Sequence, residues 1–248
     1  MKLKNALIGY SGFIGSNLLN IKKNLLKFNS KNINKIRNRN FDTVICAGTY
    51  SKMWLANKNP EKDFNNIKKL INNLKSINAK KFILISTCEV YGKHTQCNEN
   101  TKILKSKLSN YGLNRFRLEM FIKKKFFDHH IIRLPIVYGK RFSKNFLFDL
   151  INKKNLENLN GNDWVQIYNV KNLKKDINII KKKRIKLINL SSNPIKIGKI
   201  ARKFFKINLN KKRNFRVINM KSIYSKQKKY LISEKNCMND LKKFLKIK

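Results

Sequence analysis

A tyrosine and an arginine four residues apart, Tyr111 and Arg115, form the pair best suited to acid–base chemistry in this sequence. Residues i and i+4 share one face of a helix, so a helix through this segment sets the phenol beside the guanidinium. A nearby cation favours the ionised phenol, and such a phenol can exchange a proton with a carbinol. Tyr111 and Arg115 are therefore candidate catalytic residues, although the same spacing is also typical of an exposed helix pair.

Hydroxyl groups follow the apolar run 83–85 at Ser86 and Thr87. If this run is a strand of an open parallel sheet, its carboxyl end lies at the edge where ligands bind. Thr87 is then a candidate to hold the same substrate oxygen as Tyr111, or it simply caps the strand. The run 131–134 indicates a second strand that ends at the same edge.

Three glycines, Gly9, Gly12 and Gly15, follow the short apolar run 5–8 and precede an amphipathic stretch. Strand, glycine turn and helix in this order let the backbone approach a pyrophosphate and direct helix N–H groups at its charge. Alone, the motif also fits a tight structural turn. The candidate dinucleotide contacts on the turn are Gly9, Ser11, Gly12, Phe13, Ile14 and Gly15.

The elements that must position these residues alternate between short β-rich runs and longer helical patterns. Strands are expected at 5–8, 25–28, 42–46, 81–86 and 131–134, and helices at 60–77, 106–126 and 143–152. This βαβ rhythm predicts an α/β fold with a doubly wound parallel sheet. We expect a dinucleotide-binding domain over residues 1–142 and a small lobe over 143–248, parts of which can return to the sheet. In the lobe, the pattern predicts a strand at 185–190 and helices at 194–206 and 236–246.

Taken together, these motifs resemble the extended short-chain dehydrogenase/reductase family, and within it the NAD-dependent epimerase/dehydratase branch that acts on nucleotide sugars. The likeness rests on the glycine turn, Ser86-Thr87 with Val90-Tyr91-Gly92, Tyr111 with its partner, and Arg133-Leu134-Pro135 with Val137-Tyr138-Gly139. The order and spacing match over residues 5–140, and a weaker likeness continues to residue 197.

The resemblance implies a Rossmann-like sheet with a small C-terminal substrate lobe, and NAD or NADP as cofactor. It makes Tyr111 the general acid/base and Thr87 the hydroxyl that bonds the reacting sugar oxygen. It also places Ala47, Gly48 and Pro135 against the cofactor and Asn145 against the substrate diphosphate, although Asn145 fits an exposed helix start equally well.

Three departures from the family pattern refine the expected chemistry. Arg115 stands where the family usually has Lys, and an arginine keeps the charge but has a different shape and reach. Cys88 replaces one carboxyl of the Thr-Asp-Glu of dehydratases, which favours a reductase or epimerase; Cys88 and Glu89 remain candidate substrate contacts. Asn29, Ser30 and Lys31 stand where a ribose-binding acid is expected, and without that acid NADP is favoured over NAD.

The sequence therefore predicts an NAD(P)-dependent reductase or epimerase acting on a nucleotide sugar, in a setting of surface-polysaccharide precursor synthesis. An alternative is a dinucleotide-binding module of the same fold with little or no catalysis, because Arg115 and Cys88 both depart from the catalytic pattern.

The net charge of +45 suggests a nucleic-acid partner, but its distribution argues against one. The chain has 48 Lys and only 10 Arg, spread from end to end, which is typical of compositional bias rather than phosphate recognition. We expect no specific nucleic acid, no membrane partner and a cytoplasmic location, and a homodimer is left open. Cys46, Cys88, Cys97 and Cys237 show neither metal-ligand nor disulfide spacing, so no metal is expected.

Overall fold

The computed structural model describes residues 4–22, 24–92, 95–226 and 229–246. The chain divides into two compact units, each assembled from separate stretches of sequence. The first unit consists of Met1–Lys93, Lys102–Arg133 and Asn172–Ile188, and the second of His94–Thr101, Leu134–Lys171 and Asn189–Lys248. Each unit is therefore completed only when late segments of the chain join earlier ones.

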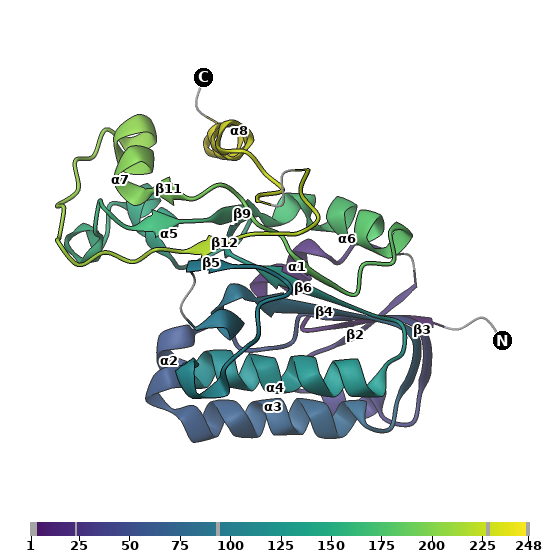
Figure 1. The fold of residues 1–248 in the computed structure, drawn as a ribbon. Coiled ribbons are helices and arrows are strands. Elements are labelled where there is room, and N and C mark those ends of the chain that lie inside the picture. Colours follow the sequence, from purple (N-terminus) through teal and green to yellow (C-terminus); the bar gives the residue numbers. More distant parts are fainter. Residues whose placement is uncertain (1–3, 23, 93–94, 227–228, 247–248) are drawn as a thin grey trace. The chain divides into compact units, whose positions relative to one another are not determined.

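A six-stranded sheet forms the centre of the first unit (Figure 1). Its strands lie in the order β10 (Leu187–Asn189), β6 (His129–Leu134), β4 (Asn78–Thr87), β3 (Asn40–Cys46), β1 (Lys4–Ile8) and β2 (Leu25–Phe28). Parallel pairing joins β1 to β2 and to β3, and β3 to β4. The predicted Rossmann-like α/β sheet is confirmed, and the strand order reverses direction between β1 and β3, where such sheets bind ligands.

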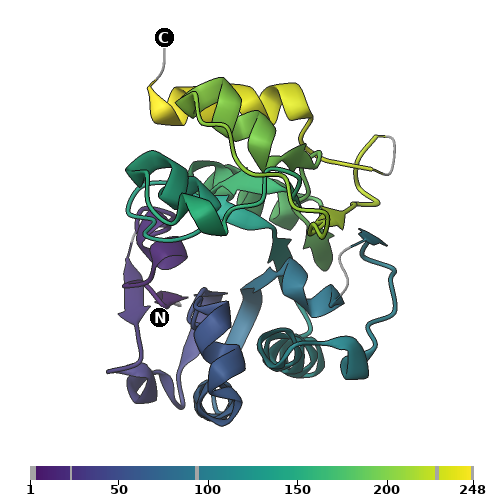
Figure 2. The same cartoon turned by 90° about the vertical axis from the view of Figure 1, so that its left-hand side faces the viewer.

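Helices cover both faces of this sheet (Figures 1 and 2). The long helices α3 (Pro60–Leu74) and α4 (Asn110–Lys125) lie on one face, and α1 (Phe13–Asn17) and α6 (Leu173–Lys182) lie on the other. Lys174 Nζ donates to the carbonyl of Asn20 at 2.8 Å, which ties α6 to the turn after α1. The apolar stripe of α3, formed by Ile67, Leu70 and Leu74, is buried in the core against the sheet.

Four short helical elements lie in the connections between the longer elements of the first unit. They are η1 (Ile33–Ile36), α2 (Met53–Lys58), η2 (Cys88–Tyr91) and η3 (Lys105–Lys107). The helix predicted over 106–126 begins only at Asn110, because the Ser109 hydroxyl accepts the Gly112 N–H and caps it.

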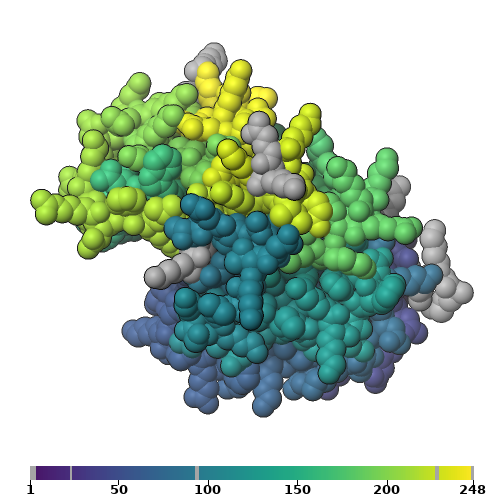
Figure 3. Space-filling model, in the orientation of Figure 1, coloured from purple at the N-terminus to yellow at the C-terminus, as the bar shows by residue number. Residues whose placement is uncertain are grey.

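The second unit contains three small two-stranded pairings. β7 (Ile136–Tyr138) pairs with β9 (Ile167–Asn169), β11 (Ile195–Lys196) with β8 (Trp164–Val165), and β12 (Asn219–Met220) with β5 (Thr95–Cys97). Figure 3 shows blue atoms of the chain segment that contains β5 beside yellow-green atoms of the C-terminal part.

Helical elements complete the second unit. They are α5 (Phe146–Asn152), η4 (Leu156–Asn158), η5 (Val170–Asn172), α7 (Ile197–Ile200) with its π-helical continuation η6 (Ala201–Phe205), and α8 (Glu234–Leu245). The helix predicted over 194–206 begins three residues late, because Ile195 and Lys196 pair with β8 instead. The strand predicted over 185–190 is limited to β10.

Among the described residues, no helix has both the length and the apolar character needed to cross a bilayer. All four cysteines are buried and carry free thiols. Within the same residues, no three His, Cys, Asp or Glu side chains gather into a set that could hold a metal ion.

Candidate functional site

A hollow of about 260 Å³ opens at the carboxyl ends of β1, β2 and β3, where the strand order reverses. Its walls come from the loops after these three strands and from α3. Seven residues predicted to contact a dinucleotide line it: Gly9, Ser11, Gly12, Asn29, Ser30, Ala47 and Gly48. Residues as far apart in the sequence as Gly9 and Gly48 are thus brought around one space.

The three glycines of the turn differ in what the fold requires of them. Gly9 has φ +83°, and a Cβ there would lie 2.4 Å from the Ala47 carbonyl oxygen. A Cβ on Gly15 would lie 2.0 Å from the Gly9 carbonyl oxygen. At Gly12 the nearest atom to a Cβ is that same oxygen at 3.4 Å, an ordinary contact, so the fold itself tolerates a Cβ there. Gly12 leaves open a space at the mouth of the turn, as an approaching phosphate requires.

Four other residues predicted to contact the cofactor do not line the hollow. Phe13, Ile14 and Gly15 begin α1, which is only five residues long. Lys31 is exposed, and its N–H donates to Asn29 Oδ1 at 3.0 Å. The predicted contacts of these four residues therefore stay predictions.

Sequence reasoning missed the part of the wall that α3 and the loop after β3 supply. Asp63, Asn66 and Lys69 project from α3, and Tyr50 and Ser51 belong to the loop. The spacing of Asn66 and Lys69 was visible in the sequence, but only knowledge of which face of α3 meets the sheet reveals that they line a space.

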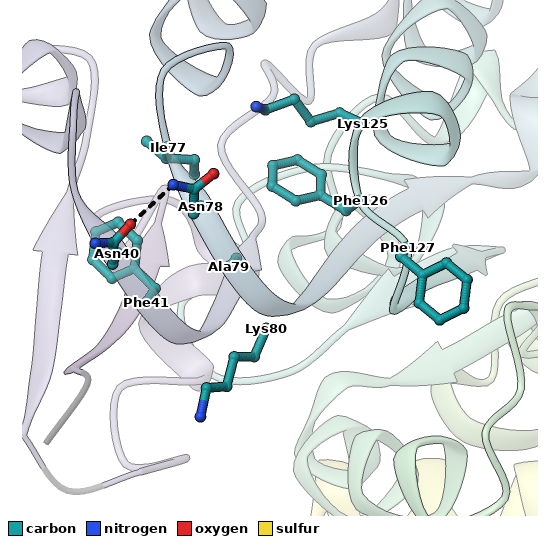
Figure 4. A pocket seen from close by; sticks show the side chains of 9 residues that line it. All are labelled: Asn40, Phe41, Ile77, Asn78, Ala79, Lys80, Lys125, Phe126 and Phe127. Carbon is teal, nitrogen blue, oxygen red and sulfur yellow. Dashed lines mark hydrogen bonds between the residues drawn. The ribbon is translucent and has the colours of Figure 1, made fainter.

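A second hollow, of about 410 Å³, lies at the opposite edge of the sheet (Figure 4). Its walls include the first residues of β3 and β4, Asn40 and Asn78, whose side chains are hydrogen-bonded at 3.0 Å. Lys80 and Lys125 add charge. None of the predicted site residues lines this hollow, so its larger size does not make it the functional site.

Tyr111 is the second residue of α4, and its side chain is buried, with 9% of the residue exposed. Its N–H donates to Asn57 Oδ1 at 3.0 Å, which links it to α2. The following residue, Gly112, packs so closely on η2 that a Cβ would lie 2.3 Å from the Glu89 carbonyl oxygen. A glycine at this position therefore lets the start of α4 rest directly on the segment that follows β4.

That segment contains the other predicted site residues. Thr87 ends β4, and its hydroxyl oxygen accepts the Glu89 N–H at 3.2 Å, so it caps η2 while its own proton stays available to donate. Cys88 is buried, with 3% exposed, and Glu89 is half-buried. The structure thus brings Thr87, Cys88 and Glu89 onto the turn on which the Tyr111 end of α4 packs.

Arg115 lies on the same face of α4 as Tyr111, as its spacing predicts. Its Cζ is 3.9 Å from the centroid of the Tyr111 ring, so the guanidinium stacks on the phenol. Its Nη1 donates to Asp63 Oδ2 and its Nη2 to the Tyr50 carbonyl oxygen. Asn114 Nδ2 donates to the same Asp63 oxygen at 2.8 Å. The Arg115 guanidinium is thus buried and hydrogen-bonded to Asp63 and to the Tyr50 carbonyl.

Burial raises the pKa of the Tyr111 phenol above its ordinary value, because the ionised form is poorly solvated. The charge of Arg115 opposes this rise but does not cancel it. The expectation that the arginine leaves the phenol easier to ionise is therefore incomplete: burial dominates, and the free site keeps Tyr111 protonated.

A buried polar network fixes the rest of α4 against the sheet. Glu119 is fully buried; its Oε1 accepts from Ser86 Oγ at 2.6 Å and Arg133 Nε at 3.0 Å, and its Oε2 from Arg133 Nη2 at 2.6 Å. Arg133 Nη1 donates to the Tyr91 hydroxyl at 2.7 Å. The network thus joins α4 to β4, η2 and β6 within the first unit.

Two predicted residues, Pro135 and Asn145, belong to the second unit. Pro135 is buried between β6 and β7. Asn145 caps α5: its Oδ1 accepts from Leu147 N at 3.0 Å and Phe148 N at 3.3 Å, and its Nδ2 donates to the Val137 carbonyl at 2.9 Å. These contacts explain Asn145 as a helix cap, and its predicted contact with the substrate stays a prediction.

Comparison with protein families shows which family the chain resembles in sequence. The model of the NAD dependent epimerase/dehydratase family matches residues 26–174, more than half of the chain. A search by sequence finds no curated protein that matches.

Solved structures similar to this chain include nucleotide-sugar epimerases and reductases. The UDP-N-acetylglucosamine 4-epimerase of Methanobrevibacter ruminantium, in complex with UDP-N-acetylmuramic acid, gives a TM-score of 0.76 at 17% identity, covering 99% of this chain and 98% of that one. The dTDP-4-dehydrorhamnose reductase of Bacillus anthracis, in complex with NADP, gives 0.67 at 18% identity, covering 88% and 84%. A Bacillus cereus UDP-glucuronic acid 4-epimerase mutant with bound NAD gives 0.66 at 17% identity, covering 98% and 99%. At these identities the likeness establishes the fold.

Proposed function

Because the chain belongs to the NAD-dependent epimerase/dehydratase family, we propose that it is an NAD(P)-dependent enzyme that reduces or epimerises a nucleotide sugar. The observation that most supports this is the hollow beside Gly12. A Cβ at Gly12 would meet no part of the protein closer than 3.4 Å, yet the residue lines the space into which the loops after β1, β2 and β3 open. An open glycine at this point fits a bound pyrophosphate.

Tyr111 and Thr87 are the residues proposed to handle the sugar hydroxyl. Tyr111 gives or takes its proton, and burial suits the phenol to start as the acid of a carbonyl reduction. The Thr87 hydroxyl holds the same sugar oxygen, since its proton stays available while its oxygen caps η2. A bound dinucleotide supplies or accepts the hydride at its nicotinamide ring.

The residues that follow β4 favour this chemistry over dehydration. Elimination of water needs an acid and a base near the sugar, and residues 87–89 contain one carboxylate, that of Glu89. A thiol occupies the adjacent position, Cys88, and it is buried. The site is therefore better suited to moving a hydride and one hydroxyl proton.

Binding of the dinucleotide is tested by titrating wild type and the Gly12→Val variant with NADPH and NADH, using nicotinamide fluorescence. We expect wild type to bind, and the variant to lose binding while unfolding at the same urea concentration, because the valine fills the approach to the pyrophosphate. Equal affinity in a folded Gly12→Val variant would falsify the assignment of the hollow.

Turnover is tested with wild type and Tyr111→Phe on dTDP-4-dehydro sugars with NADPH or NADH, and on UDP-sugars for epimerisation. Loss of a general acid/base lowers turnover about 10²–10⁴-fold, and cofactor affinity should be retained. The alternative is a binding module without catalysis. It is motivated by Arg115, whose guanidinium is hydrogen-bonded to Asp63 and to the Tyr50 carbonyl. Tight cofactor binding without turnover on any of these sugars would favour it.

A further inference from the structure

Asp63 is the carboxylate that meets both the hollow and the phenol. It lies in the first turn of α3, is 5% exposed, and lines the hollow. Its Oδ2 accepts from Arg115 Nη1 and from Asn114 Nδ2, so one oxygen receives two donors from α4. Neither the family resemblance nor the glycine motif points to this residue.

The burial of Arg115 depends on this carboxylate. Arg115 is 2% exposed, and a guanidinium so far from water is costly unless an opposite charge pairs with it. Among the described residues, Asp63 is the acid that pairs with it, and the Tyr50 carbonyl is the other acceptor. Without Asp63, the stacking of Arg115 on the Tyr111 ring would place an unpaired charge in the interior.

We propose that Asp63 is a positioning residue for the proposed reaction, which holds the Arg115 guanidinium against the face of Tyr111 and neutralises its charge there. This inference rests on the proposed function of Tyr111 as acid/base. In this arrangement, Asp63 and Tyr50 both fix Arg115 and form the wall of the hollow. The arginine favours ionisation of the phenol from the face of its ring, and Asp63 and the Tyr50 carbonyl hold it there.

Four charged or titratable groups surround the phenol, from three elements. Arg115 of α4 favours ionisation, whereas Glu89 and Cys88 of η2 and Asp63 of α3 oppose it. Asp63 thus weakens the effect of the arginine that it positions. Removing its charge, while the arginine stays in place, should ease ionisation of Tyr111.

The test compares wild type and Asp63→Asn by the near-ultraviolet absorbance of tyrosinate during a pH titration, with Tyr111→Phe in each background subtracted to isolate Tyr111. Asparagine keeps the size of the side chain and one acceptor for Arg115. We expect tyrosinate to form at lower pH in Asp63→Asn than in wild type, because a negative charge near the phenol is removed. An ion pair with only a structural role would lower the urea midpoint and leave this titration unchanged.

A second variant guards against failure of Asp63→Asn to fold. Asp63→Asn with Arg115→Gln removes both charges, and such neutral replacements are tolerated better than one unpaired charge. Since the arginine outweighs Asp63 at the phenol, Tyr111 should ionise at higher pH in this double variant than in wild type. Identical Tyr111 titrations in wild type and in every folded variant would overturn the proposal.

Neither titration needs cofactor or substrate, so this result is separate from that of the proposed function. If the enzyme turns over, its reduction needs protonated Tyr111, and the decline of turnover at high pH should begin at lower pH in Asp63→Asn. If the titrations move as expected but no sugar is turned over, the positioning role stands and the proposed activity fails.

Discussion

Two buried arginine–carboxylate pairs fix α4, and they are built differently. Arg133 bonds both oxygens of Glu119, and Ser86 and Tyr91 complete the network. Arg115 bonds one oxygen of Asp63, which it shares with Asn114, and among the described residues its Nε has no hydrogen-bond partner. We call the first pair saturated because each guanidinium nitrogen of Arg133 has an acceptor, and the second unsaturated because Arg115 Nε has none within the described part of the chain.

The difference matches what surrounds each pair. The Arg133 network joins β4, β6 and α4 in the interior of the first unit, where every polar group must be satisfied. The Arg115 pair lies between a phenol and the wall of a hollow. A saturated pair suits a structural role, and an unsaturated one next to a ligand-sized space suits a role in the chemistry.

The largest effect should come from breaking the saturated pair. Glu119→Ala leaves the Arg133 charge buried without a partner, which should lower the free energy of unfolding by about 3–5 kcal/mol. Urea denaturation followed by circular dichroism measures the loss. As a control, Glu119→Leu with Arg133→Met removes both charges and should recover most of it. If Glu119→Ala lowers the free energy of unfolding by no more than the loss of a surface ion pair does, the structural role assigned to this buried pair is wrong.

The same substitution at both arginines sharpens the comparison. Arg133→Lys gives up the bidentate contact with Glu119 and the bond to Tyr91, so it should cost about 2 kcal/mol of stability. Arg115→Lys can keep its ion pair with Asp63 and should cost about 1 kcal/mol. Urea midpoints of the two variants measure the difference.

Turnover should distinguish the same two variants: any change is expected at Arg115, the position with the smaller loss of stability, and none at Arg133. Arg115→Lys restores the cation usual in the family and should retain or raise turnover, whereas Arg133→Lys should leave turnover per folded molecule unchanged. Loss of turnover in Arg115→Lys without loss of cofactor affinity would show that the planar guanidinium stacked on Tyr111 is itself needed.

The stabilisation by bound cofactor should differ between variants by a smaller amount. NADPH at about 100 times its Kd should stabilise wild type by roughly 2.7 kcal/mol. Arg133→Lys should show the same increment, because Arg133 does not line the hollow. NADPH should stabilise Asp63→Asn by up to about 1 kcal/mol more than wild type, because the substitution removes a negative charge beside an anionic ligand. Equal increments in all three would separate Asp63 from the ligand.

The contrast between the two pairs also marks what the sequence could predict. The sheet, the glycine turn and the Tyr111–Arg115 face follow from local periodicity, which adjacent residues determine. Asp63 lies 52 residues from Arg115, and its contact depends on how α3 packs beside α4. No local pattern encodes such packing. Likewise, Arg133 was visible as part of a motif, but its partner Glu119 is identified only once α4 and β6 are placed.

The smallest expected effect concerns the choice between NADP and NAD. No acid stands at the end of β2, where Asn29 and Ser30 line the hollow, and Asp42 lies near the other end of β3, paired with Lys22 at 3.3 Å. Lys69 adds a cation to the wall. NADP should therefore bind at least as well as NAD, and Ser30→Asp should reverse the order because its carboxylate repels a 2′-phosphate. Fluorescence titration with NADPH and NADH measures both affinities.

Lys69 and its neighbour Lys68 provide a matched pair for this last prediction. Both are exposed on α3, but only Lys69 lines the hollow. Lys69→Gln should weaken NADPH about threefold more than NADH, as expected for one exposed cation near a phosphate. Lys68→Gln removes the same charge and should alter neither, and neither variant should move the urea midpoint. Equal losses in both variants would show a general effect of the positive surface, and unchanged affinities would place the 2′-phosphate away from α3.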